Sequence, residues 1–188
     1  WITNPAYFFN MQSFRYTQDT IDAELKKSKE DFILHFRSAY TDDYPPAWMI
    51  AEILPLGLLC RIYTNLKDNV IKKRVAQHFG LQVPVFSSWI VILAGLRNMC
   101  CHHCRTWNRE LATITTEPRR TKYGWIDSSR TDKRRMYYRI CMIRYFLYTV
   151  SPNNSFKDKL KTLLAAYPNI DTAAMGFPSD WESEDIWK

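Results

Sequence analysis

The scarcity of glycine is the feature of this sequence that most limits the folds open to it. Only five glycines occur in 188 residues, and long stretches separate them from one another and from the prolines. Tight turns between short strands need such residues often, whereas helices tolerate long uninterrupted stretches. The sequence therefore predicts an all-α domain of about five or six helices.

Prolines, glycines and capping residues set the expected boundaries of these helices. The expected helices span residues 17–40, 48–66 with a bend at Pro55, 69–80, 89–110, 131–150 and 155–167. Residues 1–16 lack helical periodicity and are expected to cross the core as a strap, and residues 118–130 are expected to form an exposed loop. Residues 1–168 would form one helical-bundle domain, on which residues 169–188 pack as a C-terminal tail.

Charge and cysteine content limit the classes of partner and compartment. Lysine and arginine outnumber aspartate and glutamate by 26 to 19, a net charge of +7, which is either an ordinary basic surface or one that attracts nucleic acid. No secretory signal begins the chain, and no apolar run reaches the roughly 20 residues that span a bilayer, so we expect no membrane partner. The five cysteines, three of them crowded at Cys100, Cys101 and Cys104, are expected to stay reduced in a cytoplasmic protein.

The expected helix over residues 89–110 has two chemically different faces. At about 100° per residue, its apolar positions fall on one stripe, which consists of Trp89, Leu93, Leu96, Cys100, His103 and Trp107. The opposite face contains polar residues, with Arg97 at its flank: Asn98, His102, Arg105 and Arg109. We therefore expect His103 to be buried and structural, and His102 to be exposed, on a face that is either merely solvated or chemically active.

The polar face has the residue types that cleavage of an RNA phosphodiester requires. Attack by the RNA's own 2′-hydroxyl needs a proton acceptor, a proton donor and stabilisation of charge on the phosphorane. Histidine transfers protons near neutral pH, and arginine holds phosphate oxygens with paired donors. In this scheme His102 is the acid–base residue, Arg97 stabilises the phosphate charge, and Asn98 orients His102 or the substrate. Two copies facing each other in a symmetric dimer would complete the set of groups.

The same segment shows a resemblance to a known family. Residues 96–109 read LRNMCCHHCRTWNR and resemble the LRNxCAHHxRLWNR signature of the abortive-infection (Abi) family, with Cys101 in place of the usual alanine. Further matches follow the family's order: Pro45-Pro46-Ala47-Trp48-Met49, Phe79-Gly80-Leu81, Ser88-Trp89, and Met175-Gly176-Phe177-Pro178 followed by Trp181. The resemblance covers residues 31–187. The family's usual upstream YYRLSGY-like motif does not appear, so we expect the chain to be the C-terminal part of such a protein.

The resemblance implies a HEPN-type helical bundle, because the Abi family belongs to the HEPN superfamily. The ribonuclease motif of that superfamily has the form R-x(4–6)-H, often with a polar residue after the arginine, and Arg97, Asn98 and His102 match it. It implies a metal-independent endoribonuclease of phage defence or of a toxin–antitoxin system, acting as a homodimer without a cofactor and leaving a 2′,3′-cyclic phosphate. An antitoxin or a regulatory RNA is a further expected partner. RNA contacts are expected from basic residues around the motif: Arg105, Arg109, Arg119, Arg120 and Lys122.

Three other functions stay open at this point. A catalytically inactive HEPN-type module would bind RNA or a protein through the basic loop, with Tyr123 and Trp125 stacking on bases. A zinc protein would use the run from Cys100 to Cys104, although consecutive helical residues point around the whole helix. Membrane disruption would need the basic helix at residues 69–80 or the tyrosine-rich helix at 131–150 to enter lipid.

Overall fold

The computed structural model describes all 188 residues and contains helices but no strand. It has eight α-helices and four short 3₁₀ helices, which confirms the all-α fold with more helices than expected. The chain forms two compact units, Trp1–Lys72 and Lys73–Lys188, and each is described by itself. This division differs from the expected one, which placed a single domain over residues 1–168 and a tail over residues 169–188.

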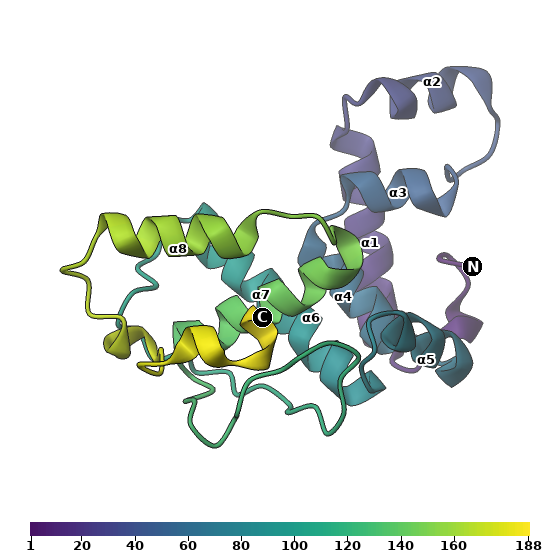
Figure 1. Cartoon of the computed structure of the whole chain (residues 1–188). Helices are drawn as coiled ribbons and strands as arrows, with labels where there is room; N and C mark the ends of the chain where they lie inside the picture. Colours follow the sequence, from purple (N-terminus) through teal and green to yellow (C-terminus); the bar gives the residue numbers. More distant parts are fainter. The chain divides into compact units, whose positions relative to one another are not determined.

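The first unit consists of helices (Figure 1), which pack around a largely aliphatic core. It contains η1 (Pro5–Tyr7), α1 (Met11–Lys27), α2 (Asp31–Ala39), α3 (Ala47–Ile53) and α4 (Leu56–Asn65), and α5 (Asn69–His78) begins in it. Its core is made up of Ile2, Phe8, Phe14, Ile21, Ile50, Leu54, Leu58, Ile62 and Leu66. Asn65 holds the N-terminal segment in place, because its side chain accepts from the Asn10 amide at 2.8 Å and donates to the Asn10 carbonyl at 3.0 Å.

Two of the expected helices are each broken into two, which is one reason why the number of helices is higher than predicted. α1 begins earlier than predicted, because Asn10 caps it by accepting a hydrogen bond from the Ser13 amide at 2.8 Å. Thr17, where the predicted helix over residues 17–40 was to begin, lies buried inside α1, and its hydroxyl donates to the Ser13 carbonyl at 2.9 Å. Ser28 then ends α1 in an extended conformation. Pro55 separates α3 from α4 where the sequence predicted only a bend.

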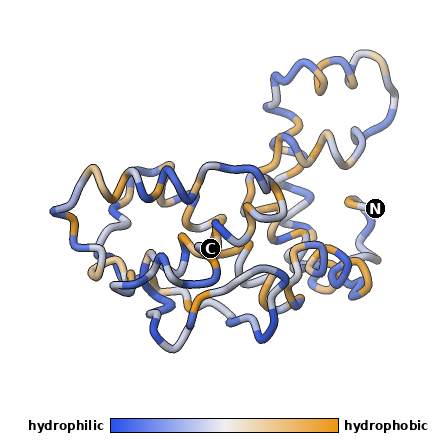
Figure 2. Tube along the Cα trace, in the orientation of Figure 1, coloured by the Kyte–Doolittle hydropathy of each residue, from blue (hydrophilic) through white to orange (hydrophobic).

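The second unit has an aromatic core around α7 (Met136–Val150). It also contains α6 (Val83–Cys101), α8 (Phe156–Ala166), η2 (Ala173–Met175), η3 (Trp181–Ser183) and η4 (Asp185–Trp187). Tyr137, Tyr138 and Tyr145 of α7 are fully buried, and hydrophobic positions recur along these helices turn by turn (Figure 2). The C-terminal segment joins this core, because Trp187 is fully buried and its Nε1 donates to Tyr137 Oη at 3.0 Å.

One helix, α6, is long and apolar enough to cross a membrane by length and composition. Core helices of soluble proteins meet the same criterion. The residues that α6 buries within the second unit are Val85, Phe86, Trp89, Ile92, Ala94 and Leu96. The apolar character of α6 is therefore only weak evidence for a membrane span.

Candidate functional site

The three residues of the predicted catalytic motif lie at the C-terminal end of α6. Arg97 and Asn98 are exposed on its last turns, and the exposed His102 is its C-terminal capping residue. The backbone amide of His102 donates to the Asn98 carbonyl at 2.9 Å, so helical spacing relates the two residues. Arg97 Nη1 donates to Asn98 Oδ1 at 3.2 Å. The fold therefore brings all three side chains to one exposed helix end.

This helix end offers a guanidinium and an imidazole to a ligand in solvent. The side-chain hydrogen bond of Arg97 goes to a neutral amide rather than to a carboxylate, so the positive charge is not neutralised. His102 lies five positions after Arg97, at the C-terminal end of the helix. One such end holds a single pair of these groups, whereas attack by a 2′-hydroxyl needs a base and an acid at once.

The helix ends at Cys101, not near Glu110 as the sequence predicted. His103 adopts the left-handed conformation with φ 53°, and the Cys104 amide donates to the Met99 carbonyl at 2.9 Å, which closes the helix. The apolar stripe therefore stops before this point. His103 is exposed rather than buried, and Trp107 is 41% exposed, so the prediction that both pack in the core was wrong.

The same turn removes Arg105 and Arg109 from the polar face of α6. Their predicted position required the helix to continue, and instead Arg105 is exposed in the loop that follows. A second left-handed residue, Asn108 with φ 46°, precedes Arg109. Arg109 lines a cavity together with Met99 of α6. It stays close to α6, but it reaches the helix from the loop.

The loop after this turn runs back along α6 toward the N-terminal end of the helix. The loop starts beside Met99 at the C-terminal end of α6, where Arg109 lines the cavity already described. Further along the loop, the Thr116 amide donates to Ser88 Oγ at 3.1 Å, and Trp89 Nε1 donates to the Thr116 carbonyl at 3.0 Å. Sequence reasoning missed this antiparallel path, because hydrogen bonds to loop carbonyls leave no periodic pattern in the sequence.

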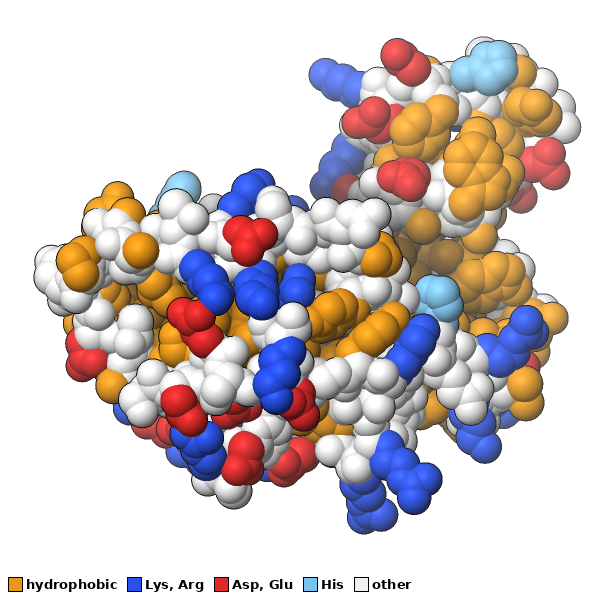
Figure 3. Space-filling view, in the orientation of Figure 1, with side chains coloured by type: hydrophobic (Ala, Val, Ile, Leu, Met, Phe, Trp, Pro, Cys, Tyr) orange, Lys and Arg blue, Asp and Glu red, His pale blue; other side chains and the backbone are white.

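A basic groove brings two predicted RNA contacts together with residues that the sequence did not indicate. Arg120 and Lys122 line a groove of about 660 Å³ with Lys73 and Gln77 of α5. Gly80 allows the close approach, because it has φ 67° and a Cβ there would stand 2.1 Å from Lys122 Cβ. Figure 3 shows basic side chains projecting from the loop between α6 and α7, at the lower edge of the view. The third predicted contact in this loop, Arg119, is exposed.

The aromatic residues of this loop, Tyr123 and Trp125, are half-buried and pack against other rings of the unit. The ring of Trp125 lies 4.7 Å from that of Trp89, centroid to centroid. Tyr123 stacks on Tyr148 at 5.0 Å, and Thr149 Oγ1 donates to Tyr123 Oη at 3.2 Å. These contacts engage part of each ring within the unit, and base stacking by Tyr123 and Trp125 stays a prediction.

The histidines and cysteines do not gather into a metal site. No group of three or more His, Cys, Asp or Glu side chains is placed to hold an ion. Cys101 and Cys104 stand at C-x-x-C spacing, and both are exposed and free. Cys60 and Cys141 are buried, and burial raises the pKa of both thiols, which keeps them protonated.

Comparison with known proteins identifies one family. A family model described as Abi-like protein matches residues 1–108, which is more than half of the chain. The match includes the helices of the first unit and all of α6, with the three motif residues at its end. It also includes residues 1–30, which lay outside the resemblance found by motif. No curated protein and no solved structure matches the chain.

Proposed function

The chain belongs to the Abi-like protein family, and from that premise we propose that it is a metal-independent endoribonuclease of phage defence. Family membership supports a role in abortive infection or phage defence. The cleavage of RNA is our addition to that role. It is supported above all by the exposed end of α6, where Arg97, Asn98 and His102 lie together.

Each of the three residues has a distinct part in the proposed reaction. The His102 imidazole removes the proton from a 2′-hydroxyl, whose oxygen attacks the adjacent phosphorus. The bond from phosphorus to the 5′-oxygen breaks, that oxygen takes a proton, and a 2′,3′-cyclic phosphate remains. Arg97 contacts the non-bridging phosphate oxygens and stabilises the phosphorane charge. Asn98 orients His102 or the substrate, and its Oδ1 accepts a hydrogen bond from the Arg97 guanidinium.

A second copy of the chain supplies the proton donor in this proposal. Two α6 ends that face each other across a twofold axis would place two imidazoles and two guanidiniums around one phosphodiester. One histidine would act as base while its counterpart acts as acid. The enzyme would thus be a cytoplasmic homodimer with RNA as substrate, and an antitoxin or a regulatory RNA would be a partner that restrains it.

The basic groove at Lys73, Arg120 and Lys122 is proposed to hold the RNA strand outside the reacting centre. Its contacts would be to phosphates, so they would position the strand without selecting a sequence. The same groove favours a second candidate function, a HEPN-type module that binds RNA without cleaving it. Phosphate contacts of either kind predict binding that weakens as salt concentration rises.

Cleavage of labelled RNA in the presence of EDTA tests the catalytic proposal. Arg97→Ala and His102→Ala are each expected to lower the rate by about 100-fold or more, because each removes a group that acts on the transition state. His103→Asn is the matched control. It removes the neighbouring imidazole, and asparagine tolerates the left-handed backbone at φ 53°. This variant should retain most of the activity.

Circular dichroism and sedimentation velocity show whether each variant folds and associates as the wild type does. A folded His102→Ala protein that cleaves RNA at the wild-type rate would contradict the assignment. RNA that binds to the wild-type protein but stays intact would favour the binding module.

A further inference from the structure

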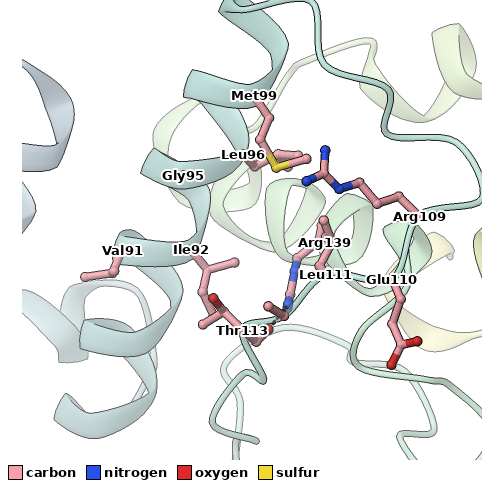
Figure 4. Close-up of a pocket in the computed structure, with 11 residues that line it drawn as sticks. Val91, Ile92, Gly95, Leu96, Met99, Arg109, Glu110, Leu111, Thr113 and Arg139 are labelled. Carbon is pink, nitrogen blue, oxygen red and sulfur yellow. Dashed lines mark hydrogen bonds between the residues drawn. The ribbon is translucent and has the colours of Figure 1, made fainter.

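A cavity of about 390 Å³ lies in the second unit, between α6 and the loop that runs back along it. The α6 wall is apolar, and Leu96 and Met99 are part of it. Arg109 enters from the loop and extends toward Met99, and Arg139 enters from α7 (Figure 4). The cavity therefore combines an apolar wall with two guanidinium groups.

These two arginines differ from a neighbouring basic side chain in having no acidic partner. Arg134 pairs with Glu110 at 2.6 Å. Glu110 is the one acidic residue of the lining, and its carboxylate is directed away from Arg109 and Arg139 (Figure 4). Neither Arg109 nor Arg139 takes part in an ion pair. The two guanidinium groups of the cavity thus have no ion-pair partner within the chain.

Arg139 makes this positive charge costly, because its side chain is almost entirely withdrawn from water. It is 1% exposed, its Nη2 donates to the Thr113 carbonyl, and its Nη1 lies 3.8 Å from Met142 Sδ. Its Nε has no hydrogen-bond partner. Burial lowers the pKa of the Arg139 guanidinium, in keeping with the missing counter-charge. An anion in the cavity would supply both a counter-charge and an acceptor.

We propose that this cavity binds one nucleotide, with its phosphate on Arg109 and Arg139 and its base against the α6 wall. Paired guanidinium donors match phosphate oxygens, and the cavity volume lies in the range of about 300–1,000 Å³ typical of small-molecule sites. Gly95 leaves room for a flat ring on the helix side, because a Cβ there would meet nothing within 4 Å.

This inference rests on the proposed function in one respect, since the nucleotide is taken to be one unit of the RNA substrate. Met99 of the cavity wall and the capping residue His102 both belong to the C-terminal end of α6, so a strand held in the cavity would extend to that end. The cavity would then fix the position of the RNA relative to Arg97 and His102.

Isothermal titration calorimetry of the full chain tests the site. The probes are the four ribonucleoside 5′-monophosphates, the corresponding nucleosides and inorganic phosphate. At least one monophosphate should bind more tightly than its nucleoside and than phosphate. Arg109→Ala should weaken that binding by about tenfold or more, because a charged hydrogen bond is lost. Arg15→Ala removes an exposed arginine of the first unit and should leave the affinity unchanged.

A second variant tests the cavity without altering either arginine. Gly95→Phe places a ring where the base is expected and should abolish binding of the monophosphate. Gly57→Phe is its control, because Gly57 is also a helical glycine with nothing within 4 Å of its Cβ position, and it lies in the first unit. Circular dichroism of both variants checks whether the fold is retained.

Three results would overturn the nucleotide site. In the first, none of the four monophosphates binds. In the second, inorganic phosphate binds as tightly as the monophosphates. In the third, a monophosphate still binds to both the Arg109→Ala and the Gly95→Phe variants. The outcomes also separate the two proposals. Binding that depends on Arg109, without RNA cleavage in EDTA, would remove the ribonuclease proposal alone. Cleavage that depends on His102, without binding of any monophosphate, would remove the nucleotide site alone.

Discussion

The two units differ in the chemistry of their cores, and the difference follows from what each core has to hold. The first unit packs helix against helix with aliphatic side chains such as Ile21 and Ile50. The second buries rings with polar groups, several of which hydrogen-bond to loop backbone or to the C-terminal segment. Trp89 donates to the Thr116 carbonyl, and Tyr137 accepts from Trp187. Irregular backbone has groups that need hydrogen bonds, which aliphatic side chains cannot give.

Trp89→Ala should give the largest effect, a loss of about 3–5 kcal/mol in the free energy of unfolding. The change removes the ring contacts to Trp125 and Tyr145 and the hydrogen bond to the Thr116 carbonyl. Urea denaturation followed by circular dichroism gives the free energy. Hydrogen exchange should show the loop over residues 109–116 losing protection. If amide exchange in this loop stayed as slow as in the wild type, the aromatic core would not be what holds the loop in place.

Ile50→Ala should cost about 2–5 kcal/mol, because it leaves a void in a fully buried aliphatic site. The loss of stability should be confined to the first unit, so amide hydrogen exchange should become faster within residues 1–72. Ile50→Val, which removes less volume, is the graded control and should cost about 0.5–1.5 kcal/mol. Faster exchange in the loop over residues 109–116 would argue against separate roles for the two cores.

A pair of tyrosine variants isolates the contribution of the polar tips. Tyr137→Phe should cost about 1–3 kcal/mol, because Trp187 Nε1 loses its acceptor and stays buried. Tyr138 Oη is buried without a hydrogen-bond partner, so Tyr138→Phe should be nearly neutral at pH 7. Thermal melts of the two variants measure the difference. Equal melting temperatures would show that the hydrogen bond to Trp187 adds nothing.

Alkaline pH should affect the second core through the same residues. Burial raises the pKa of Tyr138 from 10.0 to about 12, so the folded state keeps a proton that the unfolded chain releases. The contribution of Tyr138 to stability is therefore constant below pH 10 and falls between about pH 10 and 12, by at most about 1.4 kcal/mol per pH unit. Tyr138→Phe should flatten that part of the curve, whereas Tyr16→Phe, at a 54% exposed residue, should not.

The sequence predicted those parts of the fold whose causes lie within one helix. The prediction for residues 155–167 agrees closely with α8, and Trp89 is buried as its position on the apolar stripe indicated. The prediction failed where a distant or unusual partner decides. Histidine gives no sign that it will take the left-handed conformation that ends α6 at His103. Asn10 was missed as a helix cap because aromatic residues without clear periodicity surround it.

The candidate site likewise has a part that the sequence predicted and a part that it did not. The helical spacing of Arg97, Asn98 and His102 could be read from the sequence, and their exposure agrees with it. The cavity could not, because Arg109 and Arg139 belong to different segments that only the reversal after α6 brings together. Nothing in the sequence around Arg139 indicates that it is buried without a carboxylate.

The distribution of thiols makes the end of α6 open to selective labelling. Cys100, Cys101 and Cys104 are exposed beside His102, whereas Cys60 and Cys141 are buried with raised pKa values. A maleimide fluorophore or a spin label added to the folded native protein would therefore attach around the motif alone, with no engineered residue. Its mobility would report when RNA or a second copy docks there. Storage without a reducing agent would join copies covalently through the same sulfurs.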